Sequence, residues 1–431
     1  MDTYNVLLIG SGGREHAISW KLAQSEKLGK LYIAPGNPGT AQFGKNVQLD
    51  VNDFEAVAGF VETNSVELVI VGPEDPLVNG ITDFLRAKNI AVFGPEKNAA
   101  RLEGSKEFAK EFMLKYNIPT ADFAVFSSLD YDDALKFIVS KDTYPIVLKA
   151  DGLAAGKGVF ICNSEDEVKK RLLAIKKDDT LSKAASKLVV EEFMEGEEVS
   201  VFVICDGHTS HILHYAQDHK RIGDGDTGLN TGGMGAYSPA PLLNEALLEQ
   251  IQAEIIDPTI TGMQLEESAY TGILYVGLMM TSYGPKVVEY NCRFGDPECQ
   301  VILPSLENDL LDLMIAATEQ RLDEKSIQID DKYRCCVVLA SEGYPLKYEK
   351  GKVIKGLDKV TGDAQLFHAG TAQKGSDIVT NGGRVLNVVS SGKTLRGAID
   401  NTYEAVQKVS FENCYYRKDI GHKGLRRISN L

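Results

Sequence analysis

The sequence lacks the features that would mark a membrane, secreted or repeat protein. No hydrophobic run in its 431 residues reaches the ~18 apolar residues that a membrane-spanning helix needs. The N-terminal segment has no basic region of the kind that opens a signal peptide. No internal repeat and no low-complexity tract is found. These absences predict a cytoplasmic protein with no membrane partner.

The seven cysteines and seven histidines form no recognisable disulfide or metal framework. The cysteines are scattered, mostly within apolar runs, and no two have CxxC spacing, which favours buried free thiols in a reducing compartment. His211 and His214 lie three residues apart in a strand-like run. Their side chains therefore point to opposite faces and cannot chelate one ion.

Acidic residues are in excess, with 61 Asp and Glu against 46 Lys and Arg and a formal net charge of −15. Nucleic acid is therefore not expected as a partner, because its binding depends on a basic surface. A small anionic substrate would be captured by local lysines, arginines and backbone N–H groups. The length suits roughly three domains.

The pattern of apolar segments predicts a multidomain protein of the α/β and α+β classes. Residues 1–103 alternate short apolar strands with helices, which is typical of a doubly wound parallel sheet. Two α+β blocks follow, 104–330 and 331–431. The expected strands include 6–9, 31–33, 68–71 and 91–93, and the expected helices 17–27, 53–62, 78–88, 106–116, 245–265 and 394–409.

Glycine and proline gather where three strands of the first domain end, and ligands bind at such ends. The three segments are Gly10–Gly13, Ala34–Gly39 and Gly72–Glu74. The first partly matches a dinucleotide fingerprint, but Glu15 stands where the third glycine is required, so NAD or FAD is not expected. Because Gly12, Gly13 and Arg14 lead into a helix N-terminus, this loop is still suited to one phosphate.

The segment from Lys149 to Gly158 carries the strongest signal. A buried-looking strand delivers Lys149 and enters a loop containing Gly152, Gly156 and Lys157. Glycines let backbone N–H groups approach an anion and lysines add positive charge, so we expect a hairpin folded over phosphates. The usual phosphate loop has a Ser or Thr after its Gly-Lys pair and then a helix, and this segment has neither. The alternative is a flexible hairpin with two solvated lysines.

A second group of candidate residues ends a later strand. Alternation along a strand places Glu289, Asn291 and Arg293 on one face. A carboxylate and an amide oxygen two residues apart suit a hard cation such as Mg²⁺, especially one that also holds substrate phosphates. Arg293 is suited to bind a carboxylate or phosphoryl oxygen through two hydrogen bonds. The alternative is an exposed strand edge with a surface ion pair.

Three weaker signals accompany these groups. Lys106 precedes a helix, the segment Glu191–Met194 ends an apolar strand, and Glu198 follows shortly after it. Backbone groups of that segment could face an adenine, and Glu198 could accept hydrogen bonds from ribose hydroxyls. For each of these residues a solvated surface position is the alternative.

Together these segments resemble the ATP-grasp superfamily in order and spacing, and within it the phosphoribosylamine–glycine ligase family. The resemblance extends over essentially the whole chain. The motifs that carry it are Gly10-Ser-Gly-Gly-Arg-Glu-His-Ala17, Gly72-Pro-Glu74, Lys149-Ala-Asp-Gly-Leu-Ala-Ala-Gly-Lys-Gly158, Gln217-Asp-His-Lys-Arg221, Asn230-Thr-Gly-Gly-Met-Gly-Ala-Tyr-Ser-Pro239, Asn291-Cys-Arg-Phe-Gly-Asp-Pro-Glu298 and Arg417-Lys-Asp-Ile-Gly421.

The resemblance implies an ATP-grasp domain at 104–330, with a small mobile lid at 122–191, between an N-terminal domain (1–103) and a C-terminal domain (331–431). It implies ATP-dependent ligation of glycine to 5-phosphoribosylamine through glycyl phosphate, in de novo purine biosynthesis. Mg²⁺ is the implied metal, with Mn²⁺ as the alternative, and ATP is the co-substrate. Transient contact with neighbouring purine-pathway enzymes is a further expectation.

The resemblance also implies roles for individual residues. Lys149 and Arg293 are the expected catalytic residues, with Arg293 at the glycine carboxylate and the transferring phosphoryl group, and Glu289 and Asn291 are the expected metal ligands. The expected ATP-binding residues are Lys106, Lys149, Gly152, Gly156, Lys157, Gly158, Glu191, Phe193, Met194 and Glu198. The expected binding residues for the other substrates are Gly12, Gly13, Arg14, Glu15, His16, Asp218, Lys220, Arg293 and Asp296.

The sequence departs from the superfamily pattern at one position. Many ATP-grasp enzymes carry an acidic metal ligand on the strand before Glu289, whereas this strand has none and offers Gly277. A second Mg²⁺ would then be held by phosphates and water. Two alternatives to the implied function stay open: an ATP-grasp carboxylase or peptide ligase acting on another acid, and a nucleotide-binding sensor without turnover.

Overall fold

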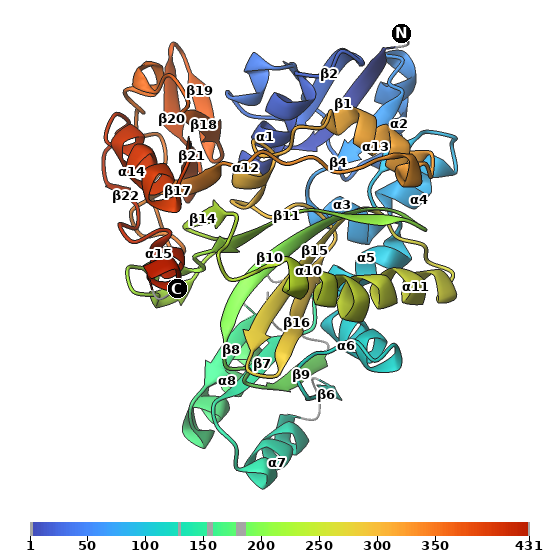
Figure 1. Ribbon diagram of the computed structural model, residues 1–431, viewed down its shortest axis with the longest axis vertical. Coiled ribbons are helices and arrows are strands. Elements are labelled where there is room, and N and C mark those ends of the chain that lie inside the picture. Colours follow the sequence, from blue (N-terminus) through green and yellow to red (C-terminus); the bar gives the residue numbers. More distant parts are fainter. Residues whose placement is uncertain (1–2, 128–130, 153–157, 178–186, 430–431) are drawn as a thin grey trace.

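The computed structural model describes residues 3–127, 131–152, 158–177 and 187–429 (Figure 1). The N-terminal domain is a parallel sheet of order β3-β2-β1-β4-β5, which confirms the doubly wound sheet expected from the sequence. Its strands are β1 (Tyr4–Gly10), β2 (Leu28–Pro35), β3 (Lys45–Asn46), β4 (Leu68–Val71) and β5 (Val92–Phe93), and its helices are α1 (Gly13–Leu22), α2 (Phe54–Thr63), α3 (Glu74–Asn79) and α4 (Ile81–Arg86).

Two helices of this domain differ from the expected ranges. The sequence predicts a helix over 17–27, whereas α1 begins at Gly13 and ends at Leu22. It begins early because the Glu15 carboxylate accepts a hydrogen bond from the Gly12 N–H (2.6 Å) and caps the first turn. The single helix predicted over 78–88 is two helices, because Gly80 takes a left-handed conformation (φ 95°) between them.

A small antiparallel sheet of order β6-β9-β7-β8 forms the segment that was expected to be a lid. It lies at the lower end of the molecule in Figure 1. Its apolar residues, among them Tyr131, Leu148 and Val190, form a buried cluster of their own. The subdomain therefore has a separate core. Its elements are β6 (Phe123–Ser127), α7 (Tyr131–Lys141), β7 (Ile146–Ala150), β8 (Val159–Cys162), α8 (Glu165–Lys177) and β9 (Lys187–Glu192).

A nine-stranded sheet runs through the middle and C-terminal parts of the chain. Its order is β16-β15-β10-β11-β14-β17-β21-β18, with β22 paired to β17. Because β14 pairs with β11 on one side and β17 on the other, the two parts share one continuous sheet. The strands are β10 (Glu197–Asp206), β11 (Ser210–Asp218), β14 (Gly235–Ser238), β15 (Thr271–Thr281), β16 (Gly284–Asn291), β17 (Tyr333–Ser341), β18 (Gln365–His368), β21 (Arg384–Gly392) and β22 (Cys414–Tyr415).

Helices pack on this sheet, and two short hairpins accompany it. The helix predicted over 245–265 is continuous, with one π-helical turn at Gln252–Ile256. Within the described ranges, no helix has both the length and the apolar character that crossing a membrane requires. The helices are α5 (Lys97–Gly104), α6 (Lys106–Lys115), α10 (Glu245–Ile251), α11 (Asp257–Leu265), α12 (Cys299–Ile302), α13 (Leu310–Thr318), α14 (Leu395–Val406) and α15 (His422–Ser429), and the hairpin strands are β12 (Arg221–Gly223), β13 (Thr227–Asn230), β19 (Thr371–Lys374) and β20 (Asp377–Thr380).

Helix α1 joins the N-terminal domain to the C-terminal domain through His16. This side chain is 2% exposed, and its ring contacts those of Phe43, Phe367 and His368. Its Nδ1 accepts a hydrogen bond from the backbone N–H of His368 (2.7 Å). Burial, with a smaller contribution from His368, lowers the pKa of His16 to about 3. The imidazole is therefore neutral and packed between the two domains.

Gly80→Ala should destabilise the protein by ~1 kcal/mol, because alanine would have to adopt a left-handed backbone at this position. Gly59→Ala is the matched control. Gly59 lies inside α2 with nothing within 4 Å of the position that its Cβ would occupy, and alanine favours a helix over glycine by up to ~1 kcal/mol. The urea midpoints of the two variants should move in opposite directions. Movement in the same direction would contradict the account of Gly80.

His16→Gln should make folding less sensitive to acid. Below pH 6.5 the unfolded chain takes up a proton at His16 that the folded chain does not, so stability falls by roughly 1.4 kcal/mol per pH unit for this group until the pH nears 3. The variant should be less stable at pH 7, because ring packing is lost, but should lose less stability than the wild type between pH 7 and 5. Urea midpoints at both pH values measure this difference.

His208→Gln is the control for that experiment, because His208 is exposed between β10 and β11. It should keep the pH dependence of the wild type. An identical pH dependence in His16→Gln and the wild type would mean that His16 is protonated in the folded protein.

Candidate active site

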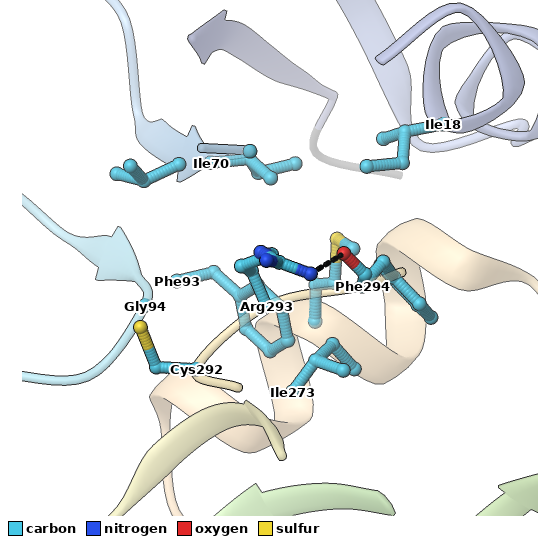
Figure 2. Close-up of a pocket in the computed structure, with 11 residues that line it drawn as sticks. Ile18, Ile70, Phe93, Gly94, Ile273, Cys292, Arg293 and Phe294 are labelled. Atoms are coloured by element: carbon cyan, nitrogen blue, oxygen red, sulfur yellow. Dashed lines mark hydrogen bonds between the residues drawn. The ribbon is translucent and has the colours of Figure 1, made fainter. Parts of the chain in front are cut away.

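A small cavity lies between the carboxyl edge of the N-terminal sheet and the loop that follows β16 (Figure 2). Arg293 lies in the middle of the view, with Ile18 and Ile70 of the N-terminal domain on one side and Ile273 of β15 on the other. The predicted catalytic arginine therefore stands where the two domains meet. The lining residues are Ile18, Ile70, Val71, Gly72, Phe93, Gly94, Ile273, Cys292, Arg293, Phe294 and Met314.

The guanidinium of Arg293 is held by carboxylates from two helices. Its Nε lies 3.1 Å from Glu74 Oε2, and its Nη2 lies 2.8 Å from Glu103 Oε1. Nη2 also donates to Asn291 Oδ1 (3.1 Å), and Nη1 donates to the Phe294 carbonyl (3.2 Å), the dashed line of Figure 2. Burial acts to lower the pKa of Arg293, but Glu103 and Glu74 outweigh it and raise the pKa overall. The arginine is thus charged and fixed in one orientation.

The glycines at the ends of β1 and β4 make room for Glu15. A Cβ at Gly10 would lie 2.4 Å from Glu15 Cγ, and a Cβ at Gly72 would lie 2.2 Å from Glu15 Oε1. The same carboxylate accepts a hydrogen bond from Arg14 Nε (2.6 Å). Gly10 and Gly72 therefore accommodate a side chain of the protein itself, at the N-terminus of α1, and phosphate binding by Gly12, Gly13 and Arg14 stays a prediction.

Asp296 connects this helix end to the C-terminal domain. Its Oδ2 accepts from the Arg14 N–H (3.3 Å) and its Oδ1 from Gln300 Nε2 (2.8 Å), and Arg384 Nη1 lies 3.5 Å from Oδ1. Arg384 also donates to the Gly232 carbonyl (2.7 Å). Burial acts to raise the pKa of Asp296, but Arg384 and Arg14 lower it overall, so the carboxylate is ionised. A residue of the C-terminal domain is thus part of the site.

Lys106 lies in the first turn of α6, against the entrance of the glycine-rich loop. Its Nζ donates to the carbonyl oxygens of Asp151 and Gly152 (3.3 and 3.0 Å). Gly156 and Lys157 lie outside the described residues. One of the expected ATP-binding lysines therefore contacts the backbone where this loop begins.

Lys149 is buried on β7 and pairs with a carboxylate of the protein. Its Nζ lies 2.9 Å from Glu191 Oε1 and donates to the Val288 carbonyl (3.2 Å). The other oxygen of Glu191 lies 3.1 Å from Lys110 Nζ. The Gly158 carbonyl accepts a hydrogen bond from the N–H of the residue after Lys149 (2.8 Å). The anion that a buried lysine requires is Glu191 here, and contact with a nucleotide phosphate stays a prediction.

The segment expected to frame an adenine connects β9 to β10. Met194 is buried and Phe193 is half-buried. Gly196 passes so close to β15 that a Cβ there would lie 2.3 Å from the Met280 carbonyl oxygen. This close approach fixes the position of Gly196 against β15. Met194 precedes Gly196 in the chain and Glu198 follows it.

Lys220 joins two of the expected ligands. Its Nζ lies 2.7 Å from Glu198 Oε2 and 3.6 Å from Glu289 Oε1. Burial acts to raise the pKa of Glu289, but Lys220, Lys149 and Lys106 lower it overall. The expected ATP-binding lysines and the expected metal ligand are thus close enough to interact, and Glu289 is ionised.

Glu289 and Asn291 offer oxygen atoms from one end of β16. Gly277 lies opposite Glu289 in the β15–β16 pairing, so β15 supplies no acid at that position, as the sequence predicts. Across the described ranges there is no group of three or more His, Cys, Asp or Glu residues that could hold a metal ion. Two hard oxygen donors fit a divalent cation whose coordination is completed by phosphates and water.

Two carboxyl groups, a buried one on Glu298 and a half-buried one on Asp218, lie beside these ligands. Glu298 is 4% exposed, and its Oε1 lies 3.4 Å from Ser200 Oγ, which donates to the Tyr275 hydroxyl (2.8 Å). Burial raises the pKa of Glu298, and burial together with the Glu298 carboxylate raises the pKa of Asp218 well above its ordinary value. This pair therefore holds a proton more readily than exposed carboxyl groups do.

Sequence reasoning missed the residues that hold the predicted ones in place. Glu74 stands in a Gly-Pro-Glu motif to which no role was assigned, although its place at the end of a strand was a usable signal. Glu103 lies on α5, a helix that was not predicted, and Lys110 lies in the helix predicted over 106–116 but was given no role. Arg384 has no motif around it. Their partners are distant in the sequence, so nothing local marks them.

The chain matches three family models along most of its length. They are the N domain of phosphoribosylglycinamide synthetase over residues 4–103, its ATP-grasp (A) domain over 104–299 and its C domain over 334–423. A phosphoribosylamine–glycine ligase of Mesorhizobium japonicum is 50% identical over 424 residues, 98% of this chain and 99% of that protein. A bifunctional purine biosynthetic protein of Schizosaccharomyces pombe is 47% identical over 430 residues, 99% of this chain but 54% of that protein.

Solved structures agree with these matches. The crystal structure of a phosphoribosylamine–glycine ligase from Thermotoga maritima superposes with a TM-score of 0.83 at 36% identity, covering 96% of this chain and 99% of that chain. The biotin carboxylase domain of a Hydrogenobacter thermophilus 2-oxoglutarate carboxylase has a TM-score of 0.75 at 16% identity, covering 96% and 92%, which shows a shared fold alone. The chain belongs to the phosphoribosylamine–glycine ligase family, also called phosphoribosylglycinamide synthetase, of the ATP-grasp enzymes.

Proposed function

We propose that this protein ligates glycine to 5-phosphoribosylamine with ATP, giving glycinamide ribonucleotide, ADP and phosphate in de novo purine biosynthesis. The observation that carries the proposal is the gathering of Lys106, Lys149 and Lys220 around the Glu289 carboxylate, in a chain that matches all three domains of the family. These residues can neutralise phosphate charge and hold reactants in line, which is what phosphoryl and acyl transfer without a covalent nucleophile require.

The reaction has two steps. A glycine carboxylate oxygen attacks the γ-phosphorus of ATP, and the bond from that phosphorus to the β–γ bridging oxygen breaks, which releases ADP. The amine of phosphoribosylamine then attacks the carbonyl carbon of glycyl phosphate. A C–N bond forms, the amine loses a proton, and inorganic phosphate leaves.

We assign the ATP-binding role to the lid side of the site. Lys106 and Lys149 would hold the phosphates, with the glycine-rich loop closing over them. The connection after β9 would frame the adenine, and Glu198 would accept from the ribose. The residues proposed for this role are Lys106, Lys149, Gly152, Gly156, Lys157, Gly158, Glu191, Phe193, Met194 and Glu198.

Glu289 and Asn291 are proposed to ligate Mg²⁺, with Mn²⁺ as the alternative. When bound, the metal would neutralise and orient phosphate oxygens. The ionised state of Glu289 supports this role. The metal would share the Glu289 carboxylate with Lys220, which also contacts Glu198, the residue proposed to bind the ribose.

Glycine and phosphoribosylamine are proposed to bind between the N-terminal domain and the loop after β16. Arg14 and Arg293 support this placement, because they share the Glu74 carboxylate at 4.0 and 3.1 Å. Arg293 would steady the glycine carboxylate and the transferring phosphoryl group. The residues proposed here are Gly12, Gly13, Arg14, Glu15, His16, Asp218, Lys220, Arg293 and Asp296, with His16 acting through packing.

The domain limits, the cellular location and the protein partners are proposed along with this function. We propose domain limits of 1–103, 104–330 and 331–431, with a lid at 122–191, and the family models support the first limit by meeting at 103 and 104. We propose a cytoplasmic location, where these substrates are found. Transient contact with neighbouring purine-pathway enzymes is supported by the bifunctional relative, in which a similar chain is part of a longer protein.

A coupled assay of ADP release, with phosphoribosylamine generated in situ, tests the function. Turnover should require both glycine and the amine. Replacement of glycine by bicarbonate or D-alanine separates this ligase from an ATP-grasp carboxylase or peptide ligase. ATP binding without turnover under every condition would favour a sensor instead.

Arg293→Lys should lower turnover roughly 100-fold while ATP still binds, because an ammonium cannot reproduce the contacts of the fixed guanidinium. Steady-state kinetics with glycine varied, together with equilibrium ATP binding, measure both effects. Lys325→Met is a suitable control, since that side chain pairs with Asp312 away from the site. Unchanged kcat and KM for glycine in Arg293→Lys would exclude the proposed role.

Glu289→Gln should raise the Mg²⁺ concentration that gives half-maximal activity by roughly tenfold or more, because a charged oxygen ligand becomes neutral. A Mg²⁺ titration at saturating ATP measures this shift. The matched control is Glu254→Gln, an exposed glutamate within the π-helical turn. A normal Mg²⁺ requirement in Glu289→Gln would remove Glu289 from the metal site.

A further inference from the structure

A buried set of charges lies behind the proposed ATP-binding lysine. Lys110, on α6, is 2% exposed, and its Nζ lies 3.1 Å from Glu191 Oε2. Lys149, on β7 of the lid, lies 2.9 Å from the other oxygen of the same carboxylate. Lys110 Nζ also donates to Thr120 Oγ1 (2.7 Å), which donates to the Val287 carbonyl of β16 (2.7 Å). One carboxylate is thus shared by two lysines from different subdomains.

This arrangement gives two buried lysines one carboxylate in direct contact. The ammonium groups of Lys110 and Lys149 each contact one oxygen of the same carboxylate, at 3.1 and 2.9 Å. A buried charge without full compensation is costly unless it has a counterion. Lys106, one turn before Lys110 on the same helix, donates to the Gly152 carbonyl where the glycine-rich loop begins, and Glu289 and Asp151 attract it. An anion that binds here would share these lysines with the carboxylates of the protein.

We propose that Lys110 is a positioning residue for ATP binding. By contacting one oxygen of Glu191 it weakens the pairing of that carboxylate with Lys149, so that Lys149 is free to pair with the ATP phosphates. Lys110 itself does not contact the nucleotide. This inference rests on the proposed role of Lys149 in ATP binding.

The contribution of Lys110 to MgATP affinity should depend on pH, because the groups around it set its pKa. Burial lowers the pKa of Lys110 to about 8, against the attraction of Glu191 and Glu192 on β9 and with the repulsion of Lys149 on β7. As the pH rises from 7 to 9, Lys110 loses its proton and Glu191 is left to Lys149 alone. The dissociation constant of MgATP should therefore rise over this interval.

The central experiment is equilibrium binding of MgATP to Lys110→Met. The dissociation constant should rise about tenfold, while the KM for glycine and the kcat at saturating ATP stay near their wild-type values. Lys115→Met, an exposed lysine of the same helix, is the control and should bind MgATP normally. Wild-type affinity in Lys110→Met would overturn the proposal.

A double variant separates this electrostatic role from a structural one. In Lys110→Met/Glu191→Gln the carboxylate is replaced by a neutral amide, so Lys149 no longer pairs with an anion of the protein and part of the lost affinity should return. If Lys110 only stabilised the fold, the second substitution would add to the damage, and such an additive loss would count against the proposal.

Lys110→Arg serves where Lys110→Met fails to fold. It keeps a charge that does not titrate below pH 9, so its MgATP affinity should stay constant between pH 7 and 9 while that of the wild type declines. The same decline in both proteins would refute the role of Lys110. Lys149→Met separates failure of the proposed ATP site from failure of the proposed role of Lys110. Normal MgATP binding in Lys149→Met would mean that the proposed ATP site is wrong. Loss of MgATP binding in Lys149→Met together with normal binding in Lys110→Met would mean that only the role of Lys110 is wrong.

Discussion

The contact of Arg293 with Glu74 and Glu103 is the interaction on which the rest of the site depends. Glu74 begins α3 at the carboxyl edge of the N-terminal sheet, Glu103 lies near the end of α5, and Arg293 follows β16 by two residues. Removal of Arg293 would leave Glu103 buried without its cation, and removal of either carboxylate would leave Arg293 with one partner instead of two. The contact therefore fixes the end of β16 against the N-terminal domain. The positions of Glu289 and Asn291 follow from it, because they lie on that same strand.

A second constraint is that most cations of the site already have carboxylate partners within the chain. Lys149 pairs with Glu191, Lys220 with Glu198 and Glu289, and Arg14 with Glu15. An acidic protein can keep such a cluster of cations desolvated only by pairing them, since unpaired buried charges are costly. Binding of an anionic substrate is then an exchange of partners rather than the filling of a positive pocket. The strength of binding depends on how completely each carboxylate is satisfied elsewhere.

The parts of this arrangement that were predictable from the sequence are local ones. Alternation on a strand placed Glu289 and Asn291 correctly at the end of β16, and the alternation of strands and helices gave the parallel sheet. The segments beginning at Gly10 and Gly72 were predicted to lie at a ligand-binding edge, but nothing in the sequence indicated that these two glycines make room for the Glu15 side chain. That outcome depends on two segments that meet only in three dimensions. For the same reason the helical residue Lys110 could not be distinguished from a solvated lysine.

The C-terminal part of the chain belongs to the site through the same kind of long-range contact. Arg384 reaches Asp296 and the Gly232 carbonyl, and the sheet continues without a break from β11 through β14 to β17. A boundary drawn from sequence near residue 330 therefore separates segments that form one sheet. The biotin carboxylase domain, only 16% identical, is similar over 96% of this chain, so this continuous framework is common to proteins of different chemistry. In this chain the framework brings Arg384 of the C-terminal part to Asp296, beside the charged residues of the ATP-grasp domain.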